Sequence, residues 1–284
     1  MIQSKSMLLE GGSTVPAEPN RGPSVLRQHA GRLPTAVGGA FPGTHAIFRG
    51  HDLHRDLGGL DWVDLYAFGI TGRRLKPEQI EMLHGIWVNT SYPDARLWNN
   101  RAAALAANSR SSPTMGMVAA LAISEATVYG GQAGLWALDF LQQALIRVQD
   151  GEDLERLVLK HAREHRIHGY GRPINSTDER LPWLMALAAK LGLANGPHVT
   201  LAFEVEKVLL RHYPKLRMNY AALHAALVSD MGLSAQEYQL LRIPTFMAGI
   251  APCFVEAAEK PEGALFATSC DAVRYHGHPL RKWR

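Results

Sequence analysis

Residues 168–180 read His-Gly-Tyr-Gly-Arg-Pro-Ile-Asn-Ser-Thr-Asp-Glu-Arg, and this stretch sets backbone-permissive residues among polar side chains. Gly169 and Gly171 can adopt positive φ or let the backbone approach a ligand closely. Pro173 fixes its own φ and biases Arg172 away from helix. The stretch therefore predicts a tight, stiff loop that holds side chains at set angles. An ordinary Gly/Pro connector has the same composition, so the pattern alone leaves both interpretations open.

The residues that follow this loop predict a helix. Thr177 or Asp178 can cap a helix that begins near Glu179 and runs to Lys190. Pro182 lies in the first turn of that helix, where a proline is tolerated because its missing N–H has no intrahelical partner. The stiff loop is thus expected to end at a helix N-terminus.

Composition limits the class of protein. The chain has 284 residues, of which 46% are hydrophobic and 20% charged, as in an ordinary globular protein, and its formal net charge is +4. Its Lys and Arg residues are scattered, which favours binding of small anions over a nucleic-acid face. Two cysteines, Cys253 and Cys270, make neither a disulfide framework nor a zinc site. Without an evident leader or an apolar run of about 18 residues, we expect a cytoplasmic protein with no membrane partner.

The order of patterns along the chain predicts an all-α fold. Residues 1–40 are rich in Gly and Pro and predict an irregular arm, and residues 44–53 predict a short strand or turn. Helical periodicity then predicts helices over residues 60–71, 76–87, 99–107, 114–128, 135–148, 154–165, 179–190, 199–212, 218–231 and 234–259, the last interrupted at Pro244 and Pro252. The range 114–128 is rich in Ala, Gly and Met, which favours close packing in a helical core or a dimer interface. We therefore expect a homodimer.

Five short motifs occur along the chain in the order found in citrate synthases. They are Arg49-Gly50-His51-Asp52-Leu53, Tyr129-Gly130-Gly131, Gly169-Tyr170-Gly171-Arg172-Pro173 with Asp178-Glu179-Arg180, Asn219 to Gly232, and Tyr275-His276-Gly277. The chain therefore resembles the citrate synthase superfamily over residues 44–284. Its short length is similar to that of the citryl-CoA lyase branch.

This resemblance implies an architecture and a reaction class. It implies an all-α dimer with a large helical domain, residues 41–130 and 234–284, and a small helical domain, residues 131–233. The active site would lie in the cleft and be completed by the partner's C-terminal tail. The family makes or cleaves a carbon–carbon bond between an acyl-CoA and a 2-oxo acid. A coenzyme A thioester is thus the expected substrate, and no metal cofactor is expected.

The positions that carry the family's chemistry are changed here. The resemblance places Tyr129, Arg172 and Ala221 where the family has its two catalytic histidines and its aspartate base, and Leu97 where a further histidine opens the segment that contains Asn100. Tyr129 can still donate a hydrogen bond to an enolate oxygen, and Arg172 suits a carboxylate or an oxyanion. Ala221 cannot act as a base, and losing a positioned base slows a reaction by about 10²- to 10⁴-fold. Ordinary citrate synthesis is therefore not expected.

Other residues are candidates for the missing roles. His168 and His224 are candidate bases, although each is also interpreted as a packed or hydrogen-bonded histidine. The resemblance implies that Arg180 binds a carboxylate, and a loop-edge charge of this kind is not expected to support the core. Further ligand contacts are assigned to Asn100 and Arg281 for the acid and to Gly169, Tyr170 and Gly171 for coenzyme A, against the alternatives of helix packing and a solvated tail.

Two functional interpretations remain open at this point. His161, His165 and His168 share a helical face, but no acidic or cysteine partner accompanies them at metal-site spacing, so we expect no metal site. We favour an enzyme that acts next to a thioester carbonyl. The alternative is a non-catalytic relative that binds coenzyme A or an organic acid, or that pairs with an active paralogue.

Overall fold

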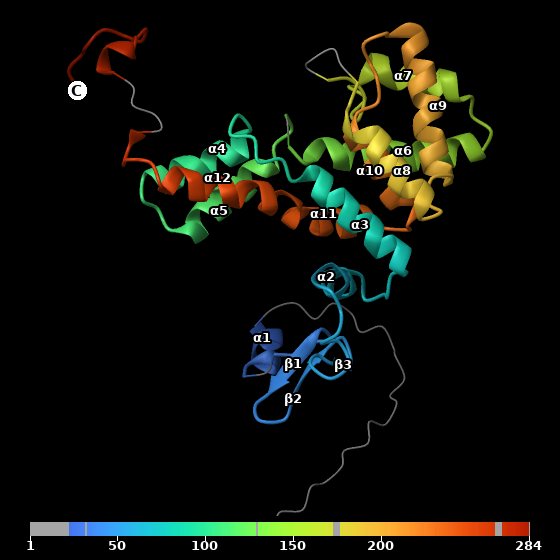
Figure 1. Cartoon of the computed structure of the whole chain (residues 1–284), viewed down its shortest axis with the longest axis horizontal. Helices are drawn as coiled ribbons and strands as arrows, with labels where there is room; N and C mark the ends of the chain where they lie inside the picture. Colours follow the sequence, from blue (N-terminus) through green and yellow to red (C-terminus); the bar gives the residue numbers. More distant parts are fainter. Residues whose placement is uncertain (1–22, 32, 129, 173–176, 265–268, 284) are drawn as a thin grey trace, which may run out of the picture. The chain divides into compact units, whose positions relative to one another are not determined.

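The computed structural model is mostly helical, as predicted, and its chain divides into two compact units, Met1–Gly58 and Gly59–Arg284 (Figure 1). The structure describes residues 23–31, 33–128, 130–172, 177–264 and 269–283. The predicted division into large and small helical domains stays a prediction.

The first unit contains a small antiparallel sheet. Its strands are β1 (Gly38–Phe41), β2 (His45–Phe48) and β3 (His51–Asp52), in the order β1-β2-β3, preceded by the helix α1 (Pro23–His29). Gly50, at φ 84°, makes the turn between β2 and β3. The short strand predicted within residues 44–53 is therefore confirmed. The prediction of an irregular arm up to residue 40 is wrong for α1 and for the start of β1, because these segments are too short to show a clear period.

The second unit is built from helices. They are α2 (Trp62–Thr71), α3 (Pro77–Thr90), α4 (Trp98–Asn108), α5 (Pro113–Ser124), α6 (Gln132–Gln149), α7 (Leu154–Glu164), α8 (Arg180–Lys190), α9 (Pro197–His212), α10 (Tyr220–Asp230), α11 (Ala235–Arg242), the 3₁₀ turn η1 (Ile243–Phe246), α12 (Met247–Ala258) and the 3₁₀ turn η3 (Cys270–Ala272). The helices from α2 to α12 match the predicted ranges, with ends that differ by a few residues, whereas no helix was predicted at η3. The largest difference is in α5, which ends four residues before the predicted Val128.

Local signals fix the helix ends. Gly72 ends α2 in the left-handed conformation at φ 67°, and its N–H donates to the Phe68 carbonyl. Pro77 takes the first position of α3. Ser234 and Glu237 form a reciprocal capping box at the start of α11. Because these signals act within a few residues, the sequence alone predicts where the helices lie.

The core of this unit surrounds α10. All residues of α10 from Ala222 to Ser229 are buried, and so is Tyr220 at its first turn. The helix packs against α6 and α9, which contribute Leu138 and Val205 among other fully buried side chains. A helix that is apolar all round belongs at the centre of a helical fold. The residues at the N-terminus of α10 are consequently held in place by the core of this unit.

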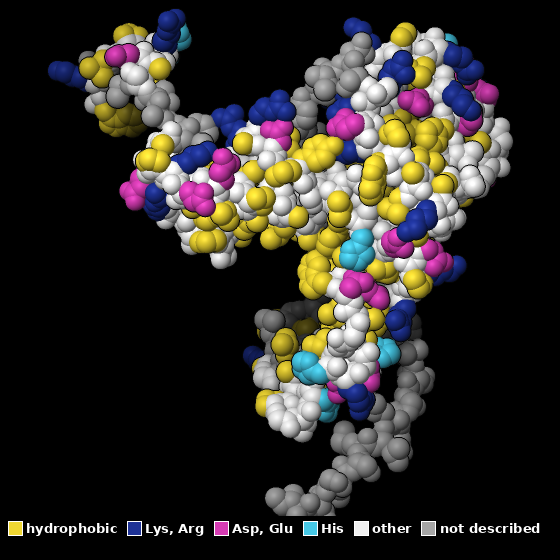
Figure 2. All heavy atoms as spheres, in the orientation of Figure 1, with side chains coloured by type: hydrophobic (Ala, Val, Ile, Leu, Met, Phe, Trp, Pro, Cys, Tyr) yellow, Lys and Arg dark blue, Asp and Glu magenta, His cyan; other side chains and the backbone are white. Residues whose placement is uncertain are grey.

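Helices α4, α5 and α12 pack through small side chains. Ala103, Ala120 and Ile250 are fully buried between them, and a Cβ added at Gly116 would lie 2.8 Å from the Phe254 ring. Several large apolar side chains on the same helices face outward, and Figure 2 shows hydrophobic side chains gathered over them. The exposed members are Leu105, Met115, Val118, Met247 and Val255. We call this set the α5 face.

One helical stretch is long and apolar enough to cross a membrane. The continuous segment Ala235–Ala258 meets that criterion by length and composition, with a mean hydropathy of 1.3 and 39% of its most apolar window buried. The apolar residues of this segment do not form an uninterrupted run, since Arg242 lies among them, so the sequence analysis did not predict it. Arg242 is 5% exposed and donates to Glu125 at 3.0 Å, so the segment is tied into the helical unit. Core helices of globular proteins meet the same criterion, and the absence of a membrane partner stays a prediction.

Candidate functional site

The Gly-Tyr-Gly turn is clamped to the segment that leads into α10. The Asn219 N–H donates to the Gly169 carbonyl at 2.9 Å, and the Gly171 N–H donates to the Arg217 carbonyl at 2.6 Å. The Asn219 side-chain amide also donates to the Gly171 carbonyl at 2.8 Å. Gly169 and Gly171 have φ of 87° and 88°, which confirms the predicted positive φ. The loop is therefore stiff over these residues, while Pro173 lies outside the described residues.

The close approach at Gly169 is made to α10. A Cβ added there would lie 2.6 Å from the Cβ of Ala222, so only glycine lets the turn pack so closely on the helix. Tyr170 is 4% exposed, and its hydroxyl donates to the Ala202 carbonyl at 2.9 Å. These contacts support a structural role for Tyr170 and Gly169. Contact of the turn with coenzyme A stays a prediction.

Arg180 at the start of α8 is bound to its own neighbour Asp178. The guanidinium donates to the Asp178 carboxylate through Nε at 2.8 Å and Nη2 at 2.7 Å, and the Asp178 side chain has no exposed surface. The carboxylate also accepts the backbone N–H of Tyr220 at 2.9 Å and that of Arg180 at 3.2 Å. Burial raises the pKa of Asp178, but Arg180 and the Tyr220 backbone N–H together more than offset this effect, so the pKa lies below its usual value. The predicted capping role of Asp178 is thus partly met.

Aromatic rings enclose the Arg180 guanidinium. Its carbon lies 4.4 Å from the centre of the Tyr220 ring and 5.3 Å from that of Tyr92. Such cation–π contacts add to the ion pair when they are partly desolvated. The expectation that Arg180 is a loop-edge charge without a role in the fold is therefore wrong, because its carboxylate partner is fully buried at the N-terminus of the core helix α10.

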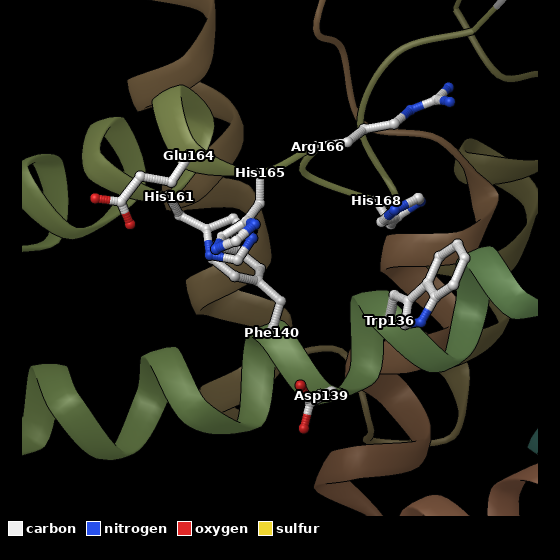
Figure 3. Close-up of a pocket in the computed structure, with 8 residues that line it drawn as sticks. All are labelled: Trp136, Asp139, Phe140, His161, Glu164, His165, Arg166 and His168. Atoms are coloured by element: carbon white, nitrogen blue, oxygen red, sulfur yellow. The ribbon is translucent and has the colours of Figure 1, made fainter.

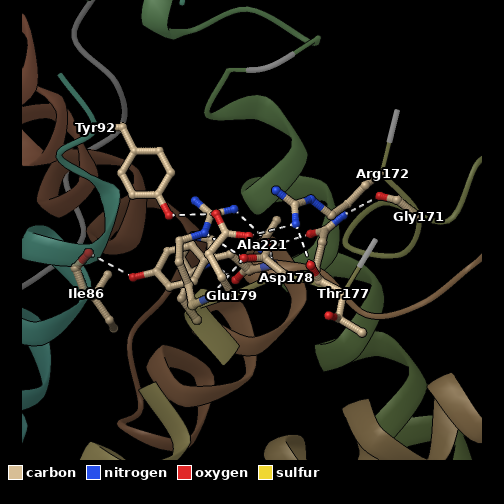
Figure 4. A network of polar contacts seen from close by, with 12 residues as sticks. Ile86, Tyr92, Gly171, Arg172, Thr177, Asp178, Glu179 and Ala221 are labelled. Carbon is tan, nitrogen blue, oxygen red and sulfur yellow. Dashed lines mark hydrogen bonds and ion pairs between the residues drawn. The ribbon is translucent and has the colours of Figure 1, made fainter. Parts of the chain in front are cut away.

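Arg172 is paired with a more exposed carboxylate: its own side chain is 19% exposed, but that of its partner Glu179 is 59% exposed. Its Nη1 donates to the Thr177 carbonyl at 2.7 Å and to the Glu179 carboxylate at 3.0 Å (Figure 4). The other oxygen of that carboxylate accepts the Tyr92 hydroxyl at 2.9 Å. Burial and this hydrogen bond raise the pKa of Tyr92. The two predicted arginines thus lie in one polar network that also contains Tyr92 and Glu179, which the sequence analysis did not select.

His224 lies beneath this network in the core. Its Nδ1 lies 2.6 Å from the Tyr220 carbonyl, which can only accept, so Nδ1 carries the proton and Nε2 accepts the Tyr238 hydroxyl. Burial, followed by the nearby Arg180 and Arg242, lowers the pKa of His224 to about 3. Gly134 of α6 leaves room for this pair, since a Cβ there would lie 2.4 Å from the Tyr238 hydroxyl oxygen. A neutral ring with both nitrogens engaged supports the packing interpretation, and a role as base stays a prediction.

His168 lies in a separate hollow of about 500 Å³ (Figure 3). Its ring lies 4.3 Å from the Trp136 ring, and burial followed by Arg166 lowers its pKa. His161 and His165 line the same hollow, with ring centres 5.2 Å apart. Among the described residues, no group of three or more His, Cys, Asp or Glu side chains is arranged to hold a metal ion.

The remaining predicted site residues are dispersed. Asn100 is 1% exposed and donates to the carbonyls of Tyr92 at 2.7 Å and Asp94 at 2.9 Å, so it fixes the loop that carries Tyr92. Ala221 follows Tyr220 in the first turn of α10. Arg281 is exposed in the C-terminal tail, and Tyr129 lies outside the described residues. Their assigned ligand contacts stay predictions.

Comparison with known proteins rests on structure alone, since neither a family model nor a curated protein sequence matches the chain. Citryl-CoA lyase from Hydrogenobacter thermophilus superposes with a TM-score of 0.77 at 21% identity, over 89% of this chain and 97% of that one. The chain has a citrate synthase-like fold. The ATP citrate lyase of Methanothrix soehngenii, solved in complex with citrate and coenzyme A, gives a TM-score of 0.69 at 16% identity over 96% of this chain.

A third structure extends the likeness to citrate synthase itself. The enzyme of the archaeon Thermoplasma acidophilum, in a ternary complex with carboxymethyl coenzyme A and oxaloacetate, gives a TM-score of 0.63 at 17% identity over 79% of this chain. The chain spans 47% of the ATP citrate lyase and 59% of this citrate synthase. The expected citrate synthase-like, all-α fold is thereby confirmed. The likeness at these identities concerns the fold.

Replacing Arg180 by lysine should destabilise the protein. A lysine cannot reproduce the two parallel bonds to the buried Asp178, so we expect a loss of about 1.5–3 kcal/mol in the free energy of unfolding. Arg147 is the matched control, because it also pairs in two-pronged fashion, with Glu152, but its side chain is 47% exposed. Arg147→Lys should cost less than about 1 kcal/mol. Equal losses in urea unfolding of the two variants would contradict this account.

His224 should make stability depend on pH. Its folded pKa of about 3 lies below the ordinary value of 6.5, so the unfolded chain binds the extra proton between these values. Stability therefore falls as pH falls through this window, by about 2 kcal/mol from this residue between pH 7 and pH 5. His224→Gln should lose about that much less than the wild type over the same interval. Contributions from other groups cancel in the comparison, so identical losses would show that His224 is not buried as a neutral ring.

Proposed function

We propose that the protein acts on a coenzyme A thioester and a carboxylate-bearing acid, and makes or cleaves the carbon–carbon bond next to the thioester carbonyl. The observation that carries this proposal is the convergence of Arg172 and Arg180 at the start of α8 within a citrate synthase-like fold. Arginine is suited to such acids because its planar guanidinium pairs with a carboxylate through parallel hydrogen bonds. The thioester and the acid are proposed substrates, and the fold supports them by likeness to proteins solved with coenzyme A and citrate.

Cleavage fits the residues better than synthesis. Synthesis begins by removing a proton from the acyl methyl group, and Ala221 offers no base for that step. Cleavage begins at the substrate hydroxyl: its proton leaves, the carbon–carbon bond breaks to give a 2-oxo acid, and the thioester enolate is then protonated. In this proposal Tyr129 donates a hydrogen bond to the enolate oxygen, and Arg172 binds a carboxylate or the developing oxyanion. The acid and the base remain unassigned.

A specific observation favours a second candidate function, that of a non-catalytic binding protein. Ala221 has no titratable group, and His224 is buried with both ring nitrogens hydrogen-bonded. A chain that offers no free base at these two positions can still bind coenzyme A or an organic acid, or pair with an active paralogue. Binding without turnover is the result that distinguishes this function from the first.

Thioester turnover tests the two functions. We expect purified protein to give negligible citrate from acetyl-CoA and oxaloacetate, because Ala221 replaces a base, and to consume citryl-CoA or malyl-CoA faster. Loss of the thioester is measured by the fall in its absorbance, and release of free coenzyme A is measured with a thiol reagent. Citrate synthesis near the roughly 10 s⁻¹ of ordinary enzymes would show that the reaction is wrongly assigned. Tight binding without turnover of any of these thioesters would support the binding protein.

We further propose that the chain forms a homodimer through the α5 face. Exposed Met115 and Val118 lie on a helix whose small residues let a partner helix approach closely. Val118→Lys should convert the dimer to a 31.2 kDa monomer in sedimentation equilibrium at micromolar concentration. Val88→Lys, on the exposed side of α3, is the control and should stay dimeric. A wild-type monomer at these concentrations would overturn the dimer and, with it, an active site shared with the partner's tail.

A further inference from the structure

Tyr92 and Arg172 together form a cradle for a carboxylate. The Tyr92 hydroxyl donates to one oxygen of Glu179 at 2.9 Å, and Arg172 Nη1 donates to the other oxygen at 3.0 Å. The donors come from two separate parts of the chain, the loop between α3 and α4 and the stiff turn, and they converge on the two oxygens of a single group (Figure 4). We call these two donors the Tyr92–Arg172 cradle. It is occupied here by a carboxylate of the protein itself.

Glu179 is a removable occupant, unlike the neighbouring Asp178. The Asp178 side chain is fully buried and accepts the backbone N–H groups of Arg180 and Tyr220 besides the Arg180 guanidinium, so it cannot leave without exposing unpaired donors. Glu179 has a side chain that is 59% exposed, and it makes no side-chain capping bond to α8 although it is the N-cap residue. Rotation of its side chain into water therefore breaks the two contacts in the cradle and a contact with its own backbone N–H, which lies near the helix end.

The energies of exchange are small. The Glu179 side chain is 59% exposed, so water can compensate for most of what its carboxylate loses on leaving Arg172 and Tyr92. An incoming carboxylate regains the same hydroxyl and guanidinium donors. It cannot bind while Glu179 stays, because two like charges would then share one cation. The cradle filled by Glu179 and the cradle filled by the acid are consequently mutually exclusive states of one site.

We propose that the cradle is a binding site for the carboxylate of an acid ligand, and that Glu179 is an internal competitor which this carboxylate displaces. The identity of the ligand as an organic acid rests on the proposed function. The proposal assigns a role to Tyr92 and divides the two arginines: Arg172 exchanges its carboxylate partner, and Arg180 keeps Asp178. According to the proposal, a substitution that removes the Glu179 carboxylate strengthens binding of the acid. If Glu179 instead only holds Arg172 in place, the same substitution weakens binding.

Titration calorimetry with oxaloacetate and with citrate, each with and without saturating coenzyme A, tests the proposal. We expect Glu179→Ala to bind the acid about two- to fivefold more tightly than the wild type, the factor that corresponds to losing an exposed competing ion pair. Adding Tyr92→Phe to Glu179→Ala should reverse the gain, since the incoming carboxylate then lacks one donor. Glu152→Ala is the matched control, because it removes a carboxylate from another arginine pair, with Arg147, and should change affinity less than twofold.

The outcomes separate this proposal from the proposed function. Melting temperatures of Glu179→Ala and Glu152→Ala within a few degrees of the wild type establish that folding is intact. If the wild type binds an acid and Glu179→Ala binds it equally or more weakly, the cradle proposal is overturned while the proposed function stands. If Glu152→Ala gains as much as Glu179→Ala, general charge is the cause and the cradle is likewise overturned. If neither wild type nor Glu179→Ala binds either acid or coenzyme A, both proposals fail.

Discussion

The carboxylate of Asp178 is the contact on which the polar end of the helical unit depends. It accepts from the Arg180 guanidinium, from the Arg180 backbone and from the Tyr220 backbone, so it joins the first residues of α8 and α10. A buried carboxylate with fewer partners would carry a large desolvation penalty. Three donors from Arg180 and one from Tyr220 offset that penalty, and they reach the carboxylate only if α8 begins at Arg180 and α10 begins at Tyr220. The positions of the two helix N-termini are therefore coupled through a single side chain.

Two sets of contacts lead away from the Asp178–Arg180 ion pair, one into the core and one toward water. In the core, the Tyr220 ring stacks on the His224 ring at 5.0 Å, and His224 is hydrogen-bonded to Tyr238 of α11, so uncharged hydrogen-bonded groups lie next to the ion pair. Toward water, the adjacent residue Glu179 accepts hydrogen bonds from Tyr92 and Arg172. Adjacent carboxylates thus have opposite environments. The Asp178 carboxylate is fixed because it accepts from four protein donors in the core. The Glu179 carboxylate is exchangeable because water can replace its partners.

The features of this arrangement that depend on neighbouring residues could be predicted from the sequence. Those that depend on contacts between distant residues could not. Helix ends at Gly72, Pro77 and Ser234 follow from chemistry within a few residues, as do the positive φ angles of Gly169 and Gly171. The contact between Tyr92 and Glu179 joins residues 87 positions apart, and no local pattern records it. Likewise, the selection of Tyr170 as a ligand contact rested on a resemblance, whereas its ring fills the core, a fact decided by packing against α9. The sequence therefore indicated the two arginines of the site but not their pairing with Asp178 and Glu179.

The glycine at position 134 has a consequence for how sequences with this core can vary. The hydroxyl of Tyr238 and the ring of His224 meet in the space that a side chain at 134 would fill. A larger residue there is compatible with the fold only if one of the other two becomes smaller at the same time. The three positions, on α6, α10 and α11, should therefore change together among homologous sequences, and a glycine at 134 should accompany the histidine–tyrosine pair wherever that pair occurs.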